Sequence, residues 1–150
     1  MKGYADTGFL LSLYGRDANS ARAVALAAKH KPAFFLTEFG ELEFANAVER
    51  LLFSLGAGAV WTPSEAQAVR ERIGQHINAG VFQLRAVPNE VWQTATRLSR
   101  HYTAKLGTRT LDVLHVAIAM SLQPDVFFTF DRRQWKLAKA AGLRVLPSKP

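Results

Sequence analysis

The chain has 150 residues and a formal net charge of +7, from 19 Lys and Arg against 12 Asp and Glu. Its 49% hydrophobic content excludes a disordered chain, and the lack of cysteine excludes disulfides, thiolate metal sites and cysteine nucleophiles. The excess of positive charge favours a polyanionic partner such as nucleic acid.

The sequence carries no targeting or membrane signal. Asp6 interrupts the stretch in which a signal peptide would need unbroken apolar residues. No apolar run approaches the roughly 18 residues of a spanning helix. We therefore expect a soluble cytoplasmic protein without a membrane partner, folded as a single domain over residues 1–150.

Short apolar strands alternate with helical periods along the whole chain. In chain order, the pattern predicts a strand at 2–5, helices at 9–14 and 18–29, a strand at 33–37, helices at 41–55 and 63–78, a strand at 81–87, helices at 88–105 and 111–122, a strand at 126–130, a helix at 132–141 and a strand at 143–146. Buried strands joined by helical crossovers predict an α/β fold with a mostly parallel central sheet covered on both faces.

Glycine, proline and capping residues mark the ends of several of these helices. Gly56 and Gly58 are expected to end the helix at 41–55. Thr62, Pro63 and Glu65 form a capping-box pattern that starts the next helix.

Four carboxylates are predicted to meet at one edge of this sheet. Asp6 and Asp131 each follow a strand, and Glu43 and Asp112 each lie near the start of a helix. Ligands of open parallel sheets bind outside the carboxyl ends of the strands. Two carboxylates about 4–5 Å apart repel by about 3–4 kcal/mol at an effective dielectric of 20, so such a cluster favours a bound cation. Oxygen ligands alone select Mg²⁺ or Mn²⁺.

Each acid also has a purely structural interpretation. Acids at helix starts accept backbone hydrogen bonds and interact favourably with the helix dipole. The hypothesis of a shared site therefore depends on the four residues together. Glu38 and Glu41 lie beside Glu43 and compete with it for the same role.

The four segments that carry these acids resemble the signature segments of the PIN-domain family, and most closely its VapC-type toxin ribonucleases. The matching motifs are the Asp-Thr pair in YADTGFLLSLY, E-x-x-N-A in LTEFGELEFANAVER, D-x-x-H-x-A in TRTLDVLHVAIA, and T-x-D in FFTFDRRQWKLAKAAGL. They occur in the family's order and cover residues 2–145. A helix shifted in register would place Glu41 instead of Glu43 at the site, although E-x-x-N-A favours Glu43.

The resemblance implies a metal-dependent endoribonuclease on a three-layer α/β/α sandwich. It transfers the catalytic and metal-binding roles to Asp6, Glu43, Asp112 and Asp131. Residues expected to line the same pocket are Thr7, Asn46, His115 and Thr129. For His115, packing or a hydrogen bond near the site is favoured over metal ligation. The resemblance also implies a cognate antitoxin and the toxin role in a toxin–antitoxin pair.

The chemistry of the residues agrees with hydrolysis of RNA. A metal-bound water loses its proton more easily and can attack phosphorus in line. Residues 132–150 hold six Lys and Arg and no acid, and we expect Arg132, Arg133 and Lys136 to face the RNA. Trp61, Trp92 and Trp135 could stack unpaired bases, although packing is the more common role of such residues.

Other partners and classes follow from the remaining residues. Exposed apolar residues on the early helices, Phe53 or Trp61, could receive the antitoxin or form a homodimer. The main alternative is a non-catalytic nucleic-acid-binding module in which the acids are helix caps. A metal-independent ribonuclease using His115 and Glu43 is a further alternative.

Overall fold

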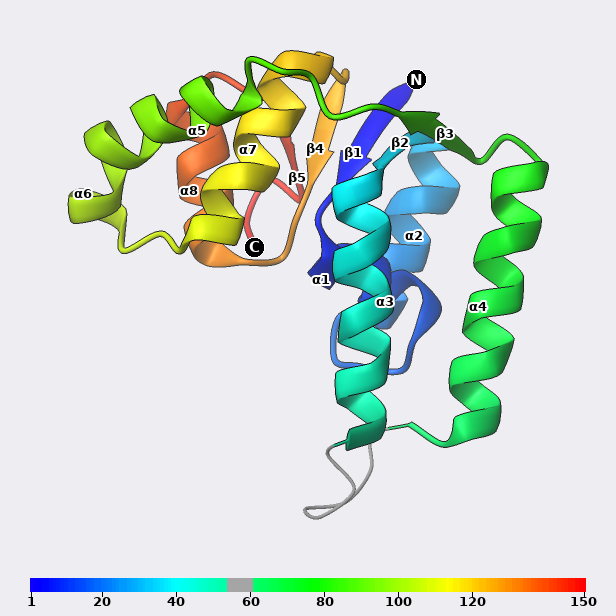
Figure 1. Ribbon diagram of the computed structural model, residues 1–150. Coiled ribbons are helices and arrows are strands. Elements are labelled where there is room, and N and C mark those ends of the chain that lie inside the picture. Colours follow the sequence, from blue (N-terminus) through cyan, green and yellow to red (C-terminus); the bar gives the residue numbers. More distant parts are fainter. Residues whose placement is uncertain (54–60) are drawn as a thin grey trace.

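The computed structural model describes residues 1–53 and 61–150 and centres on a five-stranded parallel sheet. Its strands lie in the order β3-β2-β1-β4-β5 (Figure 1). Their bounds are β1 Lys2–Ala5, β2 Ala33–Thr37, β3 Phe82–Arg85, β4 Val126–Phe128 and β5 Val145–Leu146. The chain proceeds from β1 toward one edge and later returns to pair β4 with the other side of β1. This reversal makes the carboxyl ends of β1 and β4 the switch point at which open parallel sheets commonly bind ligands.

Helices cover both faces of the sheet (Figure 1). One side carries α1 Thr7–Tyr14, α2 Ser20–His30, α3 Glu38–Phe53 and α4 Pro63–Asn78. The other side carries α5 Val91–Leu98, α7 Thr110–Leu122 and α8 Arg132–Ala140, with the short η2 Ser99–Thr103 and α6 Ala104–Leu106 between α5 and α7. The three-layer α/β/α arrangement and the parallel sheet expected from the sequence are confirmed.

The alternation of side chains along each strand builds two cores. Phe34 and Phe128 pack with the α1–α4 layer, whereas Phe35 and Phe127 pack with α5, α7 and α8. Because successive strand residues point to opposite faces, a continuous apolar run is what a strand covered on both sides requires. Each buried Phe contributes roughly 1.5–3 kcal/mol relative to an exposed one.

Gly3 allows the aromatic side chains to pack closely over the central strand. A Cβ at this position would lie 2.9 Å from the Cβ of Pro32 and 3.1 Å from the ring of Phe128. Carbon atoms essentially never approach to 2.9 Å, so a larger residue at this position would force β1 or Pro32 to shift. β1 is the strand from which the site described below begins.

The predicted element order is confirmed, while several boundaries differ. The edge strands β3 and β5 are shorter than the predicted 81–87 and 143–146, because each pairs with a single neighbour. The predicted helix at 88–105 begins at Val91 and is interrupted by the π-helical turn η2. The helix predicted at 41–55 begins earlier, at Glu38; Leu55 and the expected stop at Gly56 and Gly58 lie outside the described residues.

The start of α4 is as predicted, but the burial of the preceding residue is not. Thr62 accepts a hydrogen bond from the Glu65 amide, Glu65 accepts one from the Thr62 amide, and Pro63 opens the helix. Trp61 is only 5% exposed and packs in the α1–α4 core against Gly15. The prediction that Trp61 is exposed is therefore wrong, whereas Phe53 is 89% exposed as predicted.

No helix within residues 1–53 and 61–150 is long and apolar enough to cross a membrane.

Candidate functional site

Asp6 and Asp131 come together beyond the carboxyl ends of β1 and β4. Ala5 is the register partner of Phe128, so the residues that follow each strand, Asp6 and Thr129, lie side by side. The Thr129 hydroxyl donates to Asp6 Oδ2 (2.5 Å) and accepts from the backbone N–H of Asp131 (3.0 Å). One threonine thus joins two of the predicted acids.

Asp6 carries an energetic cost because it is buried. Its side chain is almost fully enclosed, and Oδ1 accepts from the Phe9 amide at the start of α1 (2.6 Å). Burial raises the pKa of Asp6 to about 6, and the Asp131 charge acts in the same direction. His115 and the hydrogen bonds from Thr129 and Phe9 oppose this rise in pKa. An ionised Asp6 is therefore unfavourable near neutral pH unless a positive charge approaches it.

Glu43 joins the site through a second set of hydrogen bonds. Its Oε2 accepts from the hydroxyl of Thr7, the residue after Asp6, and contacts His115 Nε2 at 2.5 Å. Burial opposes ionisation of Glu43, but His115 and Thr7 outweigh it, so the pKa of Glu43 is lowered. Glu43 therefore remains a carboxylate at neutral pH.

The buried His115 bridges Glu43 to the central strand. Its Nδ1 lies 2.9 Å from the hydroxyl of Tyr4 on β1. Burial, together with the charges of Glu43 and Asp6, raises the pKa of Tyr4 well above its ordinary value, so this hydroxyl stays protonated. The Tyr4 hydroxyl can donate to Nδ1 while Nε2–H donates to Glu43, which satisfies every group in the bridge.

Asp112 reaches the same region from the first turn of α7. Its Oδ2 accepts from the Arg109 amide (2.8 Å), and its Oδ1 lies 3.4 Å from Nε2 of Gln134 on α8. Asp131 Oδ1 in turn accepts from the backbone N–H of Arg133 and Gln134. Through Gln134, Asp112 is connected to the pair formed by Asp131 and Asp6.

The four acids fall into two hydrogen-bonded sets at the carboxyl edge of the sheet, Asp6 with Asp131 and Asp112, and Glu43 with Thr7 and His115. The two sets meet at the consecutive residues Asp6 and Thr7, and together they are called the acidic network below. Three of them also serve as helix caps, as the alternative interpretation expects: Asp6 caps α1, Asp131 caps α8, and Asp112 accepts from the residue preceding α7. Capping uses one oxygen of Asp131, and its Oδ2 has no hydrogen-bond partner within the described residues. Capping and cation binding are compatible at this residue.

The donor set fits a hard divalent cation in its chemistry. Apart from His115, the side chains of this network offer carboxylate, hydroxyl and amide oxygens, which Mg²⁺ and Mn²⁺ prefer. Oε1 of Gln134 is buried and has no hydrogen-bond partner within residues 1–53 and 61–150. An unpaired buried acceptor beside Asp112 fits a water or hydrated cation in that place. As the side chains stand, no three Asp, Glu or His residues of the described chain form a ready-made ligand cluster.

The other predicted site residues are placed as follows. Asn46 lies one turn after Glu43 on α3, exposed to solvent. Arg132 and Lys136 are exposed on α8, and Arg133 is half-buried there. Glu41, the alternative to Glu43, lies outside the network and lines a groove between α3 and α4.

Sequence reasoning missed two members of the network, Gln134 and Tyr4. Gln134 lies three residues after Asp131, at the helix position whose amide an N-cap residue binds, and this spacing is the available signal. Tyr4 belongs to a strand that reads as purely apolar. The contact of its hydroxyl with His115 joins residues 111 positions apart, and such a contact is seen only in the folded structure.

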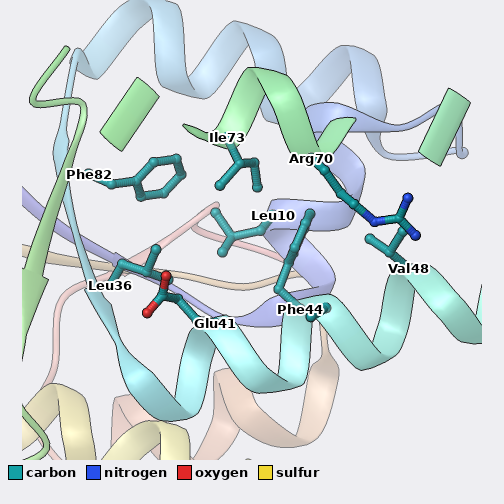
Figure 2. A pocket seen from close by; sticks show the side chains of 9 residues that line it. Leu10, Leu36, Glu41, Phe44, Val48, Arg70, Ile73 and Phe82 are labelled. Atoms are coloured by element: carbon teal, nitrogen blue, oxygen red, sulfur yellow. The ribbon is translucent and has the colours of Figure 1, made fainter. Parts of the chain in front are cut away.

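A separate apolar groove of about 250 Å³ lies between α3 and α4. Figure 2 shows Leu10, Leu36, Phe44, Ile73 and Phe82 around it, with the charged ends of Glu41 and Arg70 at its margins. Arg70 also pairs with Glu49 on α3. None of the four predicted acids lines this groove.

Comparison with known proteins identifies the fold. A family model described as PIN domain matches residues 4–141. No curated protein sequence matches the chain.

Three solved structures of similar fold share little sequence identity with the chain. FitAcB from Neisseria gonorrhoeae has a TM-score of 0.66 at 17% identity, over 95% of each chain. VapC20 from Mycobacterium tuberculosis, described as a sarcin-ricin loop cleaving toxin, has a TM-score of 0.67 at 17% identity, over 99% of this chain and 100% of that one. PAE2754 from Pyrobaculum aerophilum has a TM-score of 0.60 at 15% identity, over 97% and 90%.

Proposed function

This chain belongs to the PIN-domain family, and we propose that it is a Mg²⁺-dependent endoribonuclease acting as the toxin of a toxin–antitoxin pair. The observation that carries this proposal is the convergence of Asp6, Glu43, Asp112 and Asp131 in two hydrogen-bonded sets that meet at Asp6 and Thr7. The similarity in fold to VapC20, described as a sarcin-ricin loop cleaving toxin, supports it. Because its substrate would be RNA, we expect the protein to act in the cytoplasm.

The residues of the acidic network and of α8 would have different roles in metal and RNA binding. Asp6, Asp112 and Asp131 would hold one or two Mg²⁺ ions, with Mn²⁺ as a substitute, and Glu43 would complete the site. When bound, the metal supplies an acidified water and neutralises charge on the scissile phosphate. Thr129 fixes Asp6 relative to Asp131, Thr7 and His115 hold Glu43 ionised, and Gln134 orients Asp112. Arg132, Arg133 and Lys136 on α8 would contact the RNA backbone.

The test of this proposal is to measure RNA cleavage with Mg²⁺, with a chelator, and by three variants, of which Glu43→Gln and Glu41→Gln form a matched pair. We expect Asp6→Asn to lower cleavage about 100-fold or more through loss of metal affinity. Glu43→Gln should lower cleavage strongly, whereas Glu41→Gln, two residues away on the same helix but outside the network, should cleave like the unchanged protein. Products should carry 5′-phosphate ends. Cleavage that survives complete chelation, or equal activity of all three variants, would contradict the proposal.

Asp6, Asp131 and Asp112 all accept backbone hydrogen bonds at helix starts, so a structural role alone would explain them. The alternative function is therefore a nucleic-acid-binding module without catalysis. Titration of Mn²⁺ into the metal-free protein separates the two, because the module predicts no saturable binding. Saturable binding in the unchanged protein and its loss in Asp6→Asn support the nuclease.

A protein partner is the second part of the proposal. The apolar groove between α3 and α4 would accept an amphipathic helix of the antitoxin, and the exposed Phe53 and Leu42 on α3 offer apolar surface for the antitoxin or for a homodimer. We expect Ile73→Glu to weaken binding of the protein encoded by the adjacent reading frame about tenfold or more, since it places a charge in the groove. Gln75→Glu, on the exposed side of α4, is the control. Equal partner affinity of both variants would place the antitoxin elsewhere, and sedimentation velocity tests the homodimer.

A further inference from the structure

A second groove, of about 500 Å³, lies between α5 with η2 on one side and α7 on the other. Trp92, Thr96 and Arg100 line one wall, and Thr108, Thr110 and Leu114 line the other. Trp92 is 63% exposed, although tryptophan is a large side chain that folded proteins usually cover. Of the three tryptophans considered for stacking, Trp61 is buried, and Trp135 is half-buried with its indole N–H bonded to the Pro147 carbonyl.

The groove adjoins the catalytic network through α7. Thr110 is the first residue of α7, and Asp112 lies in the same first turn. Thr110 and Val113 line the groove, whereas Asp112 contacts Gln134 on α8. The groove and the acidic network therefore lie on either side of one helical turn, within the reach of a single polynucleotide strand.

The charge around the groove is positive. Residues 91–111 contain Arg97, Arg100, Lys105 and Arg109 and no Asp or Glu. This segment packs on the acid-free segment 132–150, since the Tyr102 hydroxyl donates to the Ala140 carbonyl (3.2 Å). Two copies of such a surface would repel each other, so the charge favours a polyanion over a second copy of the chain.

The walls provide the groups that recognise a nucleotide. The indole face of Trp92 can stack on a base, and Arg100 can contact a phosphate. Hydroxyls continue along the groove, with Ser99 Oγ and Thr103 Oγ1 3.3 Å apart and Thr103 Oγ1 and Thr108 Oγ1 2.9 Å apart. Hydroxyl side chains commonly bond phosphate and sugar oxygens.

We propose that this groove binds the single-stranded RNA beside the scissile phosphate, with Trp92 stacking on an unpaired base and Arg100 contacting the backbone. The proposal rests on the nuclease function proposed above and names the part of the substrate that the site recognises. A base can reach Trp92 only when it is unstacked, so the groove selects single-stranded or looped RNA over a continuous duplex.

The test measures binding and cleavage of a short single-stranded oligoribonucleotide. In the Asp6→Asn background with a chelator present, in which turnover is suppressed, the oligonucleotide should quench the tryptophan fluorescence and bind more tightly than the matching duplex. Trp92→Ala should weaken binding about 5- to 150-fold, the equivalent of one lost stacking contact, and Trp92→Phe should restore most of it. In the active protein Trp92→Ala should raise KM with kcat nearly unchanged. Arg100→Gln should lower the slope of log affinity against log salt by about 0.7.

The control is Val24→Ala, which removes exposed apolar surface from α2, on the face of the sheet opposite to the groove. Equal RNA binding by Trp92→Ala and the unchanged protein overturns the proposal. So does a dimer that dissociates in Trp92→Ala without a change in RNA affinity, because a second copy then covers the groove. If the unchanged protein binds RNA through Trp92 but never cleaves it, the nuclease proposal fails and the groove stands. If the unchanged protein cleaves RNA and Trp92→Ala cleaves it equally well, the proposal for the groove fails and the nuclease proposal stands.

Discussion

Residues 1–90 and 91–150 contribute to the same sheet but differ in charge. The first region holds nine Lys and Arg against nine Asp and Glu, and the second holds ten against three. The entire net charge of +7 therefore belongs to the second region. The apolar groove between α3 and α4 lies in the neutral region, and the groove beside Trp92 lies in the basic region. The separation agrees with the two proposals, in which a protein partner binds the neutral region and RNA binds the basic region.

The candidate site lies where the two regions meet. Asp6 and Glu43 come from the neutral region, and Asp112 and Asp131 come from the basic region. Hydrogen bonds cross between the regions from Thr129 to Asp6 and between His115 and both Glu43 and Tyr4. The network therefore joins the two regions as well as assembling the acids.

The largest expected change in the free energy of unfolding tests the hydrogen bonds between the two regions. His115→Ala removes the common partner of Glu43 and Tyr4 from a buried position, which leaves the Tyr4 hydroxyl unsatisfied and Glu43 with Thr7 as its remaining partner. We expect the free energy of unfolding to fall by about 3 kcal/mol. His101→Ala, at an exposed position of the basic region, should change it by no more than about 0.5 kcal/mol. Equal denaturant midpoints for the two variants would show that His115 does not join the regions.

A somewhat smaller effect is expected from the burial of Asp6. The pKa of Asp6 rises from 3.8 to about 6 on folding, so between these pH values the folded state binds more protons than the unfolded state. The stability associated with this group is present below pH 3.8 and is lost as pH rises through about 6, at a cost of about 3 kcal/mol for the ionised group.

Asp6→Asn removes that cost. We expect the metal-free variant to be more stable than the unchanged protein by about 1–3 kcal/mol at pH 7, since weakened bonds with Phe9 and Thr129 offset part of the gain. Below pH 4 the advantage should disappear. Added Mg²⁺ should stabilise the unchanged protein and leave the variant unaffected. A variant that is less stable at every pH would identify Asp6 as a cap whose charge is needed by the fold.

The smallest effect on stability, and the most direct test of the charge separation, concerns surface residues. Changing Arg132, Arg133 and Lys136 together to Gln should shift the free energy of unfolding little, about 0.5 kcal/mol or less per residue. The slope of log RNA affinity against log salt should fall by about two. The matched triple variant in the neutral region changes Arg16, Lys29 and Arg72 to Gln. Should that variant lower the slope equally, RNA binding would not be confined to residues 91–150.

Much of the fold could be predicted from local patterns. Apolar runs such as AFFLT are long enough only for buried strands, and the Thr62–Glu65 pattern specifies its helix start by local hydrogen bonds. The π-helical turn at Ser99–Thr103 could not be predicted, because the sequence continues the helical period through it. The burial of Trp61 depends on the space above Gly15, which is set by packing between α1 and α4.

The candidate site could be predicted in its members but not in its connections. Strand ends and helix starts indicated Asp6, Asp112 and Asp131, since those positions follow from local structure. The preference for Glu43 over Glu41 rested on a motif, and the bonds to Thr7 and His115 give it a physical basis. Gln134 and Tyr4 enter the network only through contacts between elements far apart in sequence, which local patterns do not encode.

The position of β1 in the middle of the sheet has a consequence for synthesis. Asp6 and its hydrogen-bond partner Thr129 are 123 residues apart in the chain, and β1 pairs with β4 as well as with β2. Closing so long a loop is slow, and it must wait until translation has produced α7, β4 and the start of α8. A nascent chain on the ribosome therefore lacks an assembled acidic network for most of its elongation.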